Sequence, residues 1–446
     1  MEKIFKFMTW KYLFNKSKDS KVKLFFEFNS FNYYKNLLIN SKASFSHNSN
    51  EKRINIFQIN NQNIKKINHF PLFYFIVFSL INCILSEKLF NYRSLNNDNI
   101  IKLYINKGGF QKVIGSKILP DEIYLNDKLT NFSNSGFISI NDDYKRNEVT
   151  LLWKKKLKSC ENLFESCNNI AEIDLSNFDT SEVTSMVGMF YECRNLENIN
   201  FENVNTSSVT DMSKMFQYCD RLTELDLTMF ETHKLKTMDN MFFEAYSLNY
   251  LQITSFDTSQ VTSMECTFYG MESLLSLDVS NFNTSKVTNM KLLFGSCLFL
   301  SSLNLSNFDT SKVENMDGMF TLSYSLMELN LSNFDTSKVT NMNNMFGQCY
   351  ALRYLDLSGF NTSKVQIMDY MFYYCSDLTY INLTDIDISN VYGMKFMFAQ
   401  CPSLTSLDLS SFIFKQSDVA YLFFDDKSLK EILHDVEKPV DNSTHQ

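Results

Sequence analysis

Apolar residues recur along this chain at a fixed interval of 26 residues, from about residue 157 to residue 430. The cleanest copy, residues 326–351, reads LMELNLSNFDTSKVTNMNNMFGQCYA. The most regular column is phenylalanine, and it consists of Phe190, Phe216, Phe242, Phe268, Phe294, Phe320, Phe346, Phe372, Phe398 and Phe424. A fixed period in this range is typical of proteins in which each repeat packs on the next.

The order of residues within one copy predicts its local structure. The run Leu-x-x-Leu-x-Leu-Ser alternates apolar and polar positions, as a short strand with one buried face does. The run Asn-Phe-Asp-Thr-Ser predicts a turn, because its polar side chains can bond their own backbone. Val-Thr-x-Met predicts a second extended piece. Met-x-x-Met-Phe-x-x-Cys has apolar residues at three- and four-residue spacing, which predicts one or two turns of helix.

The motif L-x-x-L-D-L-S-N-F-D-T-S-K-V-T-N-M-x-x-M-F-x-x-C resembles the 26-residue repeat of bacterial surface proteins, a divergent leucine-rich repeat of the BspA type. The resemblance covers about Leu157 to Leu429. It implies an α/β repeat fold, a right-handed leucine-rich-repeat solenoid, in cell-surface or secreted proteins. At the usual strand spacing, a stack of about ten rungs would be roughly 50 Å long. The family motif carries no catalytic residues that could be transferred to this chain.

Composition divides the chain into five segments. They are a basic Lys- and Asn-rich extension expected to be disordered (1–69), an apolar segment (70–86), a β-rich region (87–156), the repeats (157–430) and a polar tail (431–446). Within the β-rich region we expect strands at residues 100–105, 110–114, 122–125, 137–140 and 149–153. Because the ends of a repeat stack need covering, we expect this region to cap the first rung.

The apolar run FPLFYFIVFSLINCIL, residues 70–85, predicts the location of the protein. Its sixteen residues are long for a signal-peptide core and short for a spanning helix, and Lys65 and Lys66 precede it. It is therefore either a secretion signal, with residues 1–69 wrongly included, or an uncleaved membrane anchor with the repeats outside the cell. The alternative, a run buried in a soluble domain, would make the protein an intracellular repeat scaffold.

The charge distribution and the absence of motifs exclude several classes of function. Residues 1–69 carry 13 basic and 4 acidic residues, whereas the remainder of the chain has a net charge of −17. This strong negative charge outside residues 1–69 argues against nucleic acid as a partner of the repeats. No nucleophile–base motif, phosphate-binding loop or dinucleotide fingerprint occurs, and no Cys-x-x-Cys or paired His. The sequence therefore predicts no enzyme, metal site or cofactor.

Cysteine forms a second column, which consists of Cys167, Cys193, Cys219, Cys297, Cys349, Cys375 and Cys401. Ala245, Met271 and Ser323 interrupt it. These replacements fit a small buried side chain better than an obligate disulfide framework. Near the first rung, Cys160 and Cys167 remain the candidates for a disulfide bridge.

Polar columns complete the repeat. One outward row mixes acids and amides, and reads Asp174, Asn200, Asp226, Gln252, Asp278, Asn304, Asn330, Asp356, Asn382 and Asp408. Such mixing predicts a polar ladder rather than a calcium or catalytic site. Local backbone bonds are expected in the turn column, which consists of Asp179, Asp257, Asp309, Asp335 and Asp387. Outside the repeats, Asn131 and Asn442 lie in glycosylation sequons.

Departures from the consensus on the exposed strand face carry the functional hypothesis. The outward position two residues after the first Leu holds Tyr250, Tyr354 and Tyr380, with Arg353 beside the last two. Exposed aromatic side chains on a rigid face are typical binding anchors. We therefore expect a non-enzymatic cell-surface or secreted protein that mediates adhesion, or binds a protein or glycan, through its strand face. The alternatives are the intracellular scaffold and a structural coat component without a specific ligand.

Overall fold

The computed structural model describes residues 99–141, 145–414 and 421–424, and the backbone of three short strand segments outside these ranges. The chain forms two units, Met1–Arg93 and Ser94–Gln446. In the first unit, β1 (Phe25–Phe26) pairs antiparallel with β2 (Ile54–Asn55). Apart from these strands, the predictions for residues 1–69 and 70–86 fall outside the described residues. Within the described residues, no helix has the length and hydropathy needed to cross a bilayer.

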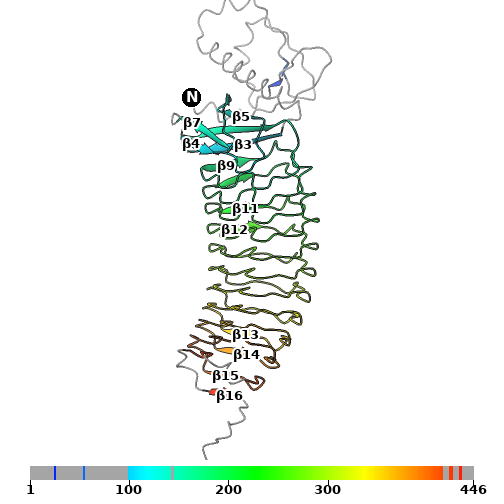
Figure 1. Ribbon diagram of the computed structural model, residues 1–446, viewed down its shortest axis with the longest axis vertical. Coiled ribbons are helices and arrows are strands. Elements are labelled where there is room, and N and C mark those ends of the chain that lie inside the picture. The colour runs from blue at the N-terminus through cyan, green and yellow to red at the C-terminus, as the bar shows by residue number, and fades with distance from the viewer. Residues whose placement is uncertain are drawn as a thin grey trace, which may run out of the picture. The chain divides into compact units, whose positions relative to one another are not determined.

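The N-terminal part of the second unit is a small β-rich region that pairs with the first repeat. Its strands are β3 (Asn99–Ile105), β4 (Gly109–Lys112), β5 (Glu122–Leu125), β6 (Lys128–Thr130), β7 (Phe137–Ile140) and β8 (Asn147–Trp153). β4 pairs with β7, and the others join a six-stranded sheet in the order β10-β9-β3-β8-β5-β6. β3 pairs antiparallel with β9 (Ile170–Asp174), the strand of the first repeat (Figure 1). All these strands except β6 lie where the sequence predicted them.

Strand β6 belongs to a hairpin that the sequence analysis missed. Leu125 pairs with Lys128, and the two residues between them, Asn126 and Asp127, have positive φ values of 48° and 65°. Two consecutive left-handed residues are typical of a type I′ turn, which Asn and Asp tolerate well. The dipeptide was therefore the available signal for this hairpin.

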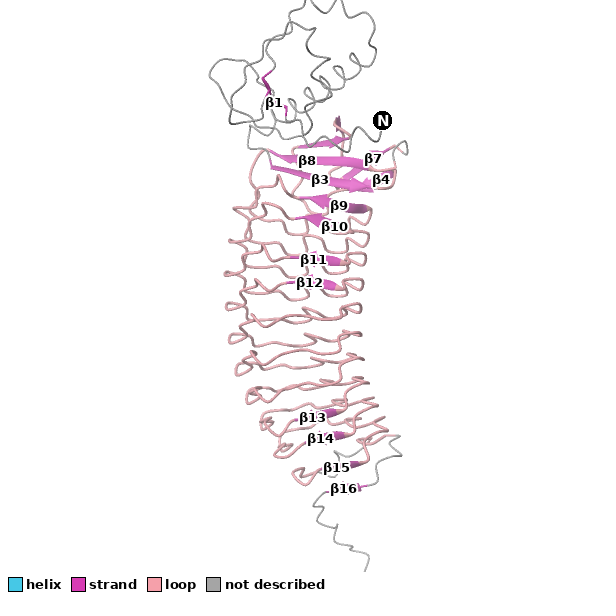
Figure 2. Cartoon of the chain, turned by 180° about the vertical axis from the view of Figure 1, so that it is seen from behind, coloured by secondary structure: helices cyan, strands magenta, loops and turns pink. Residues whose placement is uncertain are grey.

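The repeats form rungs that lie one on the next (Figures 1 and 2). The strands of one edge are β9, β10 (Asn198–Asn200), β11 (Glu224–Asp226), β12 (Tyr250–Gln252), β13 (Tyr354–Asp356), β14 (Tyr380–Asn382), β15 (Ser406–Asp408) and β16 (Glu431–Leu433). They pair in parallel two by two, β9 with β10, β11 with β12, β13 with β14 and β15 with β16, as in Tyr354 with Tyr380. The second extended piece makes single parallel bridges between successive rungs, from Ser159–Ser185 to Ile367–Gly393. The structure is therefore rich in repeats and dominated by strands.

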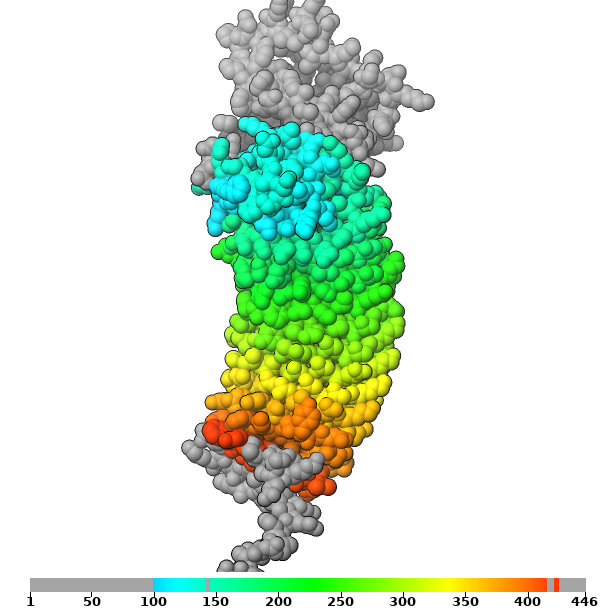
Figure 3. Space-filling view, in the orientation of Figure 1, coloured from blue at the N-terminus to red at the C-terminus, as the bar shows by residue number. Residues whose placement is uncertain are grey.

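The phenylalanine column is the centre of the core. From Phe164 to Phe398, neighbouring rings stack with centroids 5.3–6.0 Å apart and planes within 17° of parallel. All these rings are buried, as predicted, and the rungs pack closely on one another on the face that Figure 3 shows. The last member was predicted wrongly, because Phe423 rather than Phe424 stacks on Phe398.

Buried threonine hydroxyls tie each rung to the next. The column consists of Thr180, Thr206, Thr232, Thr258, Thr284, Thr310, Thr336 and Thr362, all at most 2% exposed. The Thr284 hydroxyl donates to the Asp309 carbonyl at 2.9 Å and accepts from the Asp309 N–H at 2.8 Å. One side chain thereby satisfies two backbone groups of the following rung, which would be costly to leave unpaired in the core.

The predicted turns of helix are not formed, and no helix occurs among the described residues. In the segment of the second Met, the Met189 N–H does bond the Met186 carbonyl three residues back, but the Phe190 N–H donates to Met215 of the next rung. Gly188 between them has a φ of 56°, which interrupts any helix. The α/β class is therefore corrected to a strand-dominated repeat, because bonds between rungs replace bonds within a helix.

Each described rung has two left-handed positions, and the residues at the first of them were a signal against a helix. The column reads Asn162, Gly188, Lys214, Asn240, Cys266, Leu292, Gly318, Asn344, Tyr370 and Phe396, with φ values between 53° and 60°. Half of these residues are Gly or Asn, the types that adopt this conformation at least cost. The stack imposes the same conformation on the other rungs.

Candidate functional site

The strand edge of the stack presents alternate side chains to solvent. In β13, Leu355 is buried, whereas Tyr354 and Asp356 on either side of it are exposed. This follows from the two-residue period of a strand, with one face packed on the core. We call the outward side of β9 to β15 the strand face.

Tyr354 and Tyr380 form an exposed aromatic pair on this face. They are register partners on adjacent strands, and their rings stack with centroids 5.2 Å apart and planes 8° apart. Each side chain remains half-exposed, at 51% and 50%. The Arg353 carbonyl accepts hydrogen bonds from the Thr379 N–H at 3.0 Å and hydroxyl at 2.9 Å, which fixes the neighbouring rung. The structure therefore brings the side chains of Tyr354 and Tyr380 together, and the backbone of Arg353 bonds to the neighbouring rung.

Tyr250 is exposed on the same face but belongs to another place along it. It lies on β12, four 26-residue steps before Tyr354, so the structure does not bring it together with the tyrosine pair. Its hydroxyl accepts a hydrogen bond from Gln252 at 2.9 Å, and its register partner is Glu224. The four residues of the sequence prediction thus form two separate sites.

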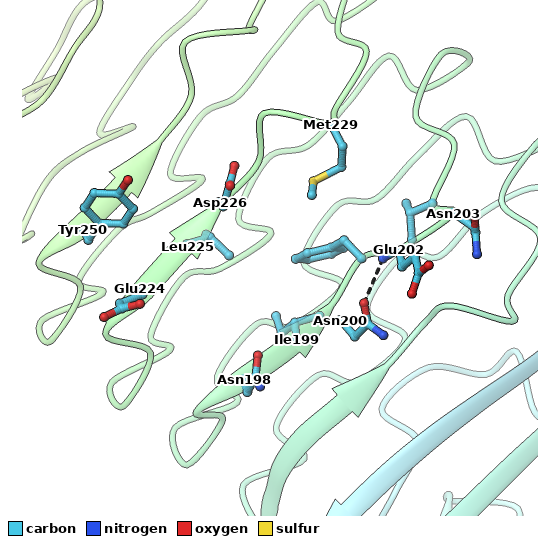
Figure 4. A pocket seen from close by; sticks show the side chains of 12 residues that line it. Asn198, Ile199, Asn200, Glu202, Asn203, Glu224, Leu225, Asp226, Met229 and Tyr250 are labelled. Atoms are coloured by element: carbon cyan, nitrogen blue, oxygen red, sulfur yellow. Dashed lines mark hydrogen bonds between the residues drawn. The ribbon is translucent and has the colours of Figure 1, made fainter. Parts of the chain in front are cut away.

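A hollow of about 670 Å³ opens beside Tyr250, and the sequence did not predict it. Figure 4 shows Glu224, Leu225 and Asp226 of β11 between Tyr250 on one side and β10 on the other, with Met229 at the far edge. A signal for it existed. Val204, which lines the hollow, stands where other rungs carry a buried phenylalanine such as Phe178 or Phe230.

Acidic and amide residues of the face accept local hydrogen bonds from the residue two positions later. Asp226 accepts from the Thr228 N–H at 2.9 Å and hydroxyl at 2.6 Å, and Asn304 accepts from the Ser306 N–H at 3.1 Å. The bonds from the Thr228 hydroxyl and N–H lower the pKa of Asp226, so its carboxylate is charged at neutral pH. Among the described residues, no group of three or more His, Cys, Asp or Glu could hold a metal ion.

A second aromatic surface, also missed, lies on the turn segments of the last rungs. It consists of Tyr370, Tyr373, Tyr374, Phe396, Tyr421 and Phe424. Tyr370 and Tyr374 are about one-third exposed, and Tyr421 and Phe424 more than half. The apolar spacing of this segment predicted a helix, in which these side chains were not expected to be neighbours.

The cysteine column is buried and hydrogen-bonded. Each thiol from Cys193 onward donates to the carbonyl of a column phenylalanine in the preceding rung, as Cys349 does to Phe320 at 3.1 Å. The Ser323 hydroxyl makes the same bond, to Phe294 at 2.9 Å. Burial raises the pKa of Cys193, Cys297 and Cys349 to about 12, so these thiols are not nucleophiles.

The remaining predicted sites lie apart from the strand face. Cys160 and Cys167 are both unpaired and buried, so the candidate disulfide is not formed. Both side chains belong to the packed core, and the Cys167 thiol donates to the Glu165 carbonyl at 3.9 Å. Asn131 is exposed just after β6. Asn442 lies outside the described residues.

Comparison with known proteins identifies the repeat. The family described as “Mycoplasma protein of unknown function, DUF285” matches residues 158–252, 248–351, 299–412 and 323–435, which together span more than half of the chain. No curated protein matches.

Two solved structures resemble parts of the chain. One is the TLR13–ssRNA13 complex, at 15% identity over 64% of this chain and a TM-score of 0.20. The other is the functional domain of InlJ from Listeria monocytogenes, which includes a cysteine ladder, at 13% identity over 59% and a TM-score of 0.17. The matches cover 46% and 63% of those chains, respectively.

Proposed function

Because this chain belongs to the DUF285 family, whose description records no function, we propose from its own surface that it is a binding protein without catalytic activity. It recognises a protein or glycan partner through the strand face. Its finer fold assignment is a BspA-like, right-handed leucine-rich-repeat solenoid of about ten rungs. We place the repeats at the cell surface or outside the cell, which the apolar run at residues 70–85 supports.

The observation that carries this proposal is the stacked pair Tyr354–Tyr380. Their backbones are held in register by parallel pairing and by the bonds to Arg353, so the rings lose little further freedom when a partner binds. Each ring presents a large apolar surface and a polar hydroxyl, and Arg353 beside them adds a planar cation. This combination is typical of anchors at recognition surfaces.

The test is binding of the full chain to immobilised glycans and to immobilised extracellular-matrix proteins. We expect saturable binding to one of the two sets, reduced at least tenfold by Tyr354→Ala with Tyr380→Ala. The matched control is Tyr392→Ala, since Tyr392 is 71% exposed and lies outside the strand face. Circular dichroism of each variant checks the fold. Unchanged binding by the double variant, or no binding by the wild type to either set, would contradict the proposal.

A further inference from the structure

The hollow beside Tyr250 exists because one rung departs from the repeat. Val204 replaces the phenylalanine of the equivalent rungs, and Phe201 stands where they carry a smaller residue such as Leu175 or Leu227. The Phe201 ring fits edge-on against Phe230, with centroids 5.1 Å apart. The phenylalanine thus stands three positions earlier in the chain, and the smaller side chain of Val204 leaves space that forms part of the hollow.

The floor of the hollow is apolar. Leu225 and Val204 form its buried part, and the Met229 side chain, 47% exposed, forms an edge. The ring of Tyr250 stands on the next strand. An aliphatic chain laid on this floor would gain burial without displacing any packed residue.

The rim of the hollow is acidic. Glu202, Glu224 and Asp226 line it, and no lysine, arginine or histidine is among its twelve lining residues. The basic residue Arg221 belongs to a different contact, since it pairs with Glu197 at 3.5 Å and neither of these residues lines the hollow. Within the described residues, no ion pair neutralises these three carboxylates.

From this shape and charge we propose that the hollow binds a lysine or arginine side chain of a partner polypeptide. The aliphatic stem would lie on Leu225 and Met229, and the cationic end would meet the carboxylates of Glu224 and Asp226. The face of Tyr250 adds a favourable contact for a cation. An anionic group would be repelled by the rim, and a purely apolar one would leave the carboxylates partly desolvated without a partner.

Two groups of the hollow are already oriented before any ligand binds. The Asp226 carboxylate is held by Thr228, and the Tyr250 hydroxyl is held by Gln252. Fewer side chains must therefore be ordered on binding, which lowers the entropic cost. The site lies on β10 to β12, so it is separate from the Tyr354–Tyr380 pair and goes beyond the function proposed above.

The experiment follows the ¹³C-methyl resonance of Met229 in the full chain, assigned with Met229→Leu. The probes are the acetylated amides of arginine and lysine, with the acetylated amide of glutamine as the neutral control. We expect a saturable shift of Met229 with the two cationic probes and none with glutamine. Met327, which is also 47% exposed on the strand face, is the internal reference and should not shift.

Restoring the consensus should close the site. We expect Val204→Phe to weaken the response at least fivefold. The double variant Phe201→Leu with Val204→Phe has the residues of the other rungs at both positions. It should also weaken the response at least fivefold, and it serves as the test if the single variant packs poorly. The matched control is Ile386→Phe, which restores the same column in a distant rung and should leave binding unchanged. The double variant Glu224→Gln with Asp226→Asn tests the negative charge of the rim. The turn after residue 226 should be kept, because Asn200 and Asn304, at the equivalent position of other rungs, accept the same hydrogen bond from the N–H two residues later.

Several outcomes would overturn the proposal. These are the absence of a saturable Met229 shift, an equal shift with the glutamine probe, or full binding by both consensus variants. Tyr354→Ala with Tyr380→Ala should not alter the Met229 response. Binding at the hollow can therefore be judged separately from binding at the tyrosine pair.

Discussion

Phe398 and Phe423 stack with ring centroids 5.8 Å apart, so the aromatic column ends one residue before the position that the 26-residue period predicts. Hydrogen bonding shows the same shift, since the Phe398 N–H donates to Leu422, whereas the Phe372 N–H donates to Met397. The pairing of Ser406 with Glu431 is likewise one residue short. Phe424 is left 53% exposed, although it continues the sequence pattern.

This register shift predicts unequal effects of two adjacent substitutions. Phe423→Ala should destabilise the last rung by about 1–3 kcal/mol, because the Phe423 ring is only partly buried. Phe346→Ala, which removes a fully buried ring, should cost more, roughly 3–5 kcal/mol. Phe424→Ala should cost less than about 1 kcal/mol. The hydrogen-exchange rate of the Phe398 amide measures the stability of the last rung, because this amide donates to the Leu422 carbonyl in that rung. Faster exchange in the Phe424 variant than in the Phe423 variant would contradict the observed register.

The threonine column should stabilise the stack through its hydroxyls. Thr284→Val keeps the shape of the side chain but leaves the N–H and carbonyl of Asp309 without their partner. We expect a loss of about 1–3 kcal/mol in the free energy of unfolding, measured by urea denaturation. Thr288→Val is the control, because this exposed hydroxyl makes one bond, to Thr262 at 3.3 Å. Equal effects of the two variants would argue against the buried ladder.

Asp179 should contribute to stability in a defined pH window. Its bonds to Lys156 first, and to Ser181, lower its pKa to about 2. A carboxyl with a depressed pKa in the folded state stabilises the fold above its unfolded pKa of about 3.9 and loses that contribution as pH falls toward 2. Asp179→Asn should therefore flatten the stability curve between these values. Asn205, which bonds Ser207 at 2.9 Å in the same column, shows that an amide keeps the turn. An unchanged slope would contradict the assignment.

The column thiols should be inert in the folded protein. Burial raises the pKa of the buried thiols, to about 12 for Cys193, and leaves almost no thiolate at pH 8. The variant Cys83→Ser removes the cysteine that lies outside the described residues. We expect this full-length variant to react with a thiol reagent only in denaturant. Rapid modification of one or more thiols under native conditions would show that the stack opens locally.

The sequence predicted which residues face inward with high accuracy, because that information is periodic. Apart from Phe424 and the partly buried Ile199, the columns of Phe, Leu, Met and Cys are buried at the expected positions, and Tyr354 and Tyr380 are exposed as expected. Periodicity failed in the segment from Met186 to Cys193, where three- and four-residue spacing predicted a helix. A chain that turns at left-handed residues such as Gly188 gives the same apolar spacing, so only the hydrogen-bond partners distinguish the two.

The sequence by itself determined that the rungs repeat, which side chains are inward and where the strand face lies, because each of these follows from local alternation and a constant step. Only the tertiary structure decided which backbone groups bond, that Tyr354 stacks on Tyr380, that Phe423 replaces Phe424 and that Val204 opens a hollow. These features depend on contacts between residues about 26 positions apart, and their geometry is set when one rung packs on the next.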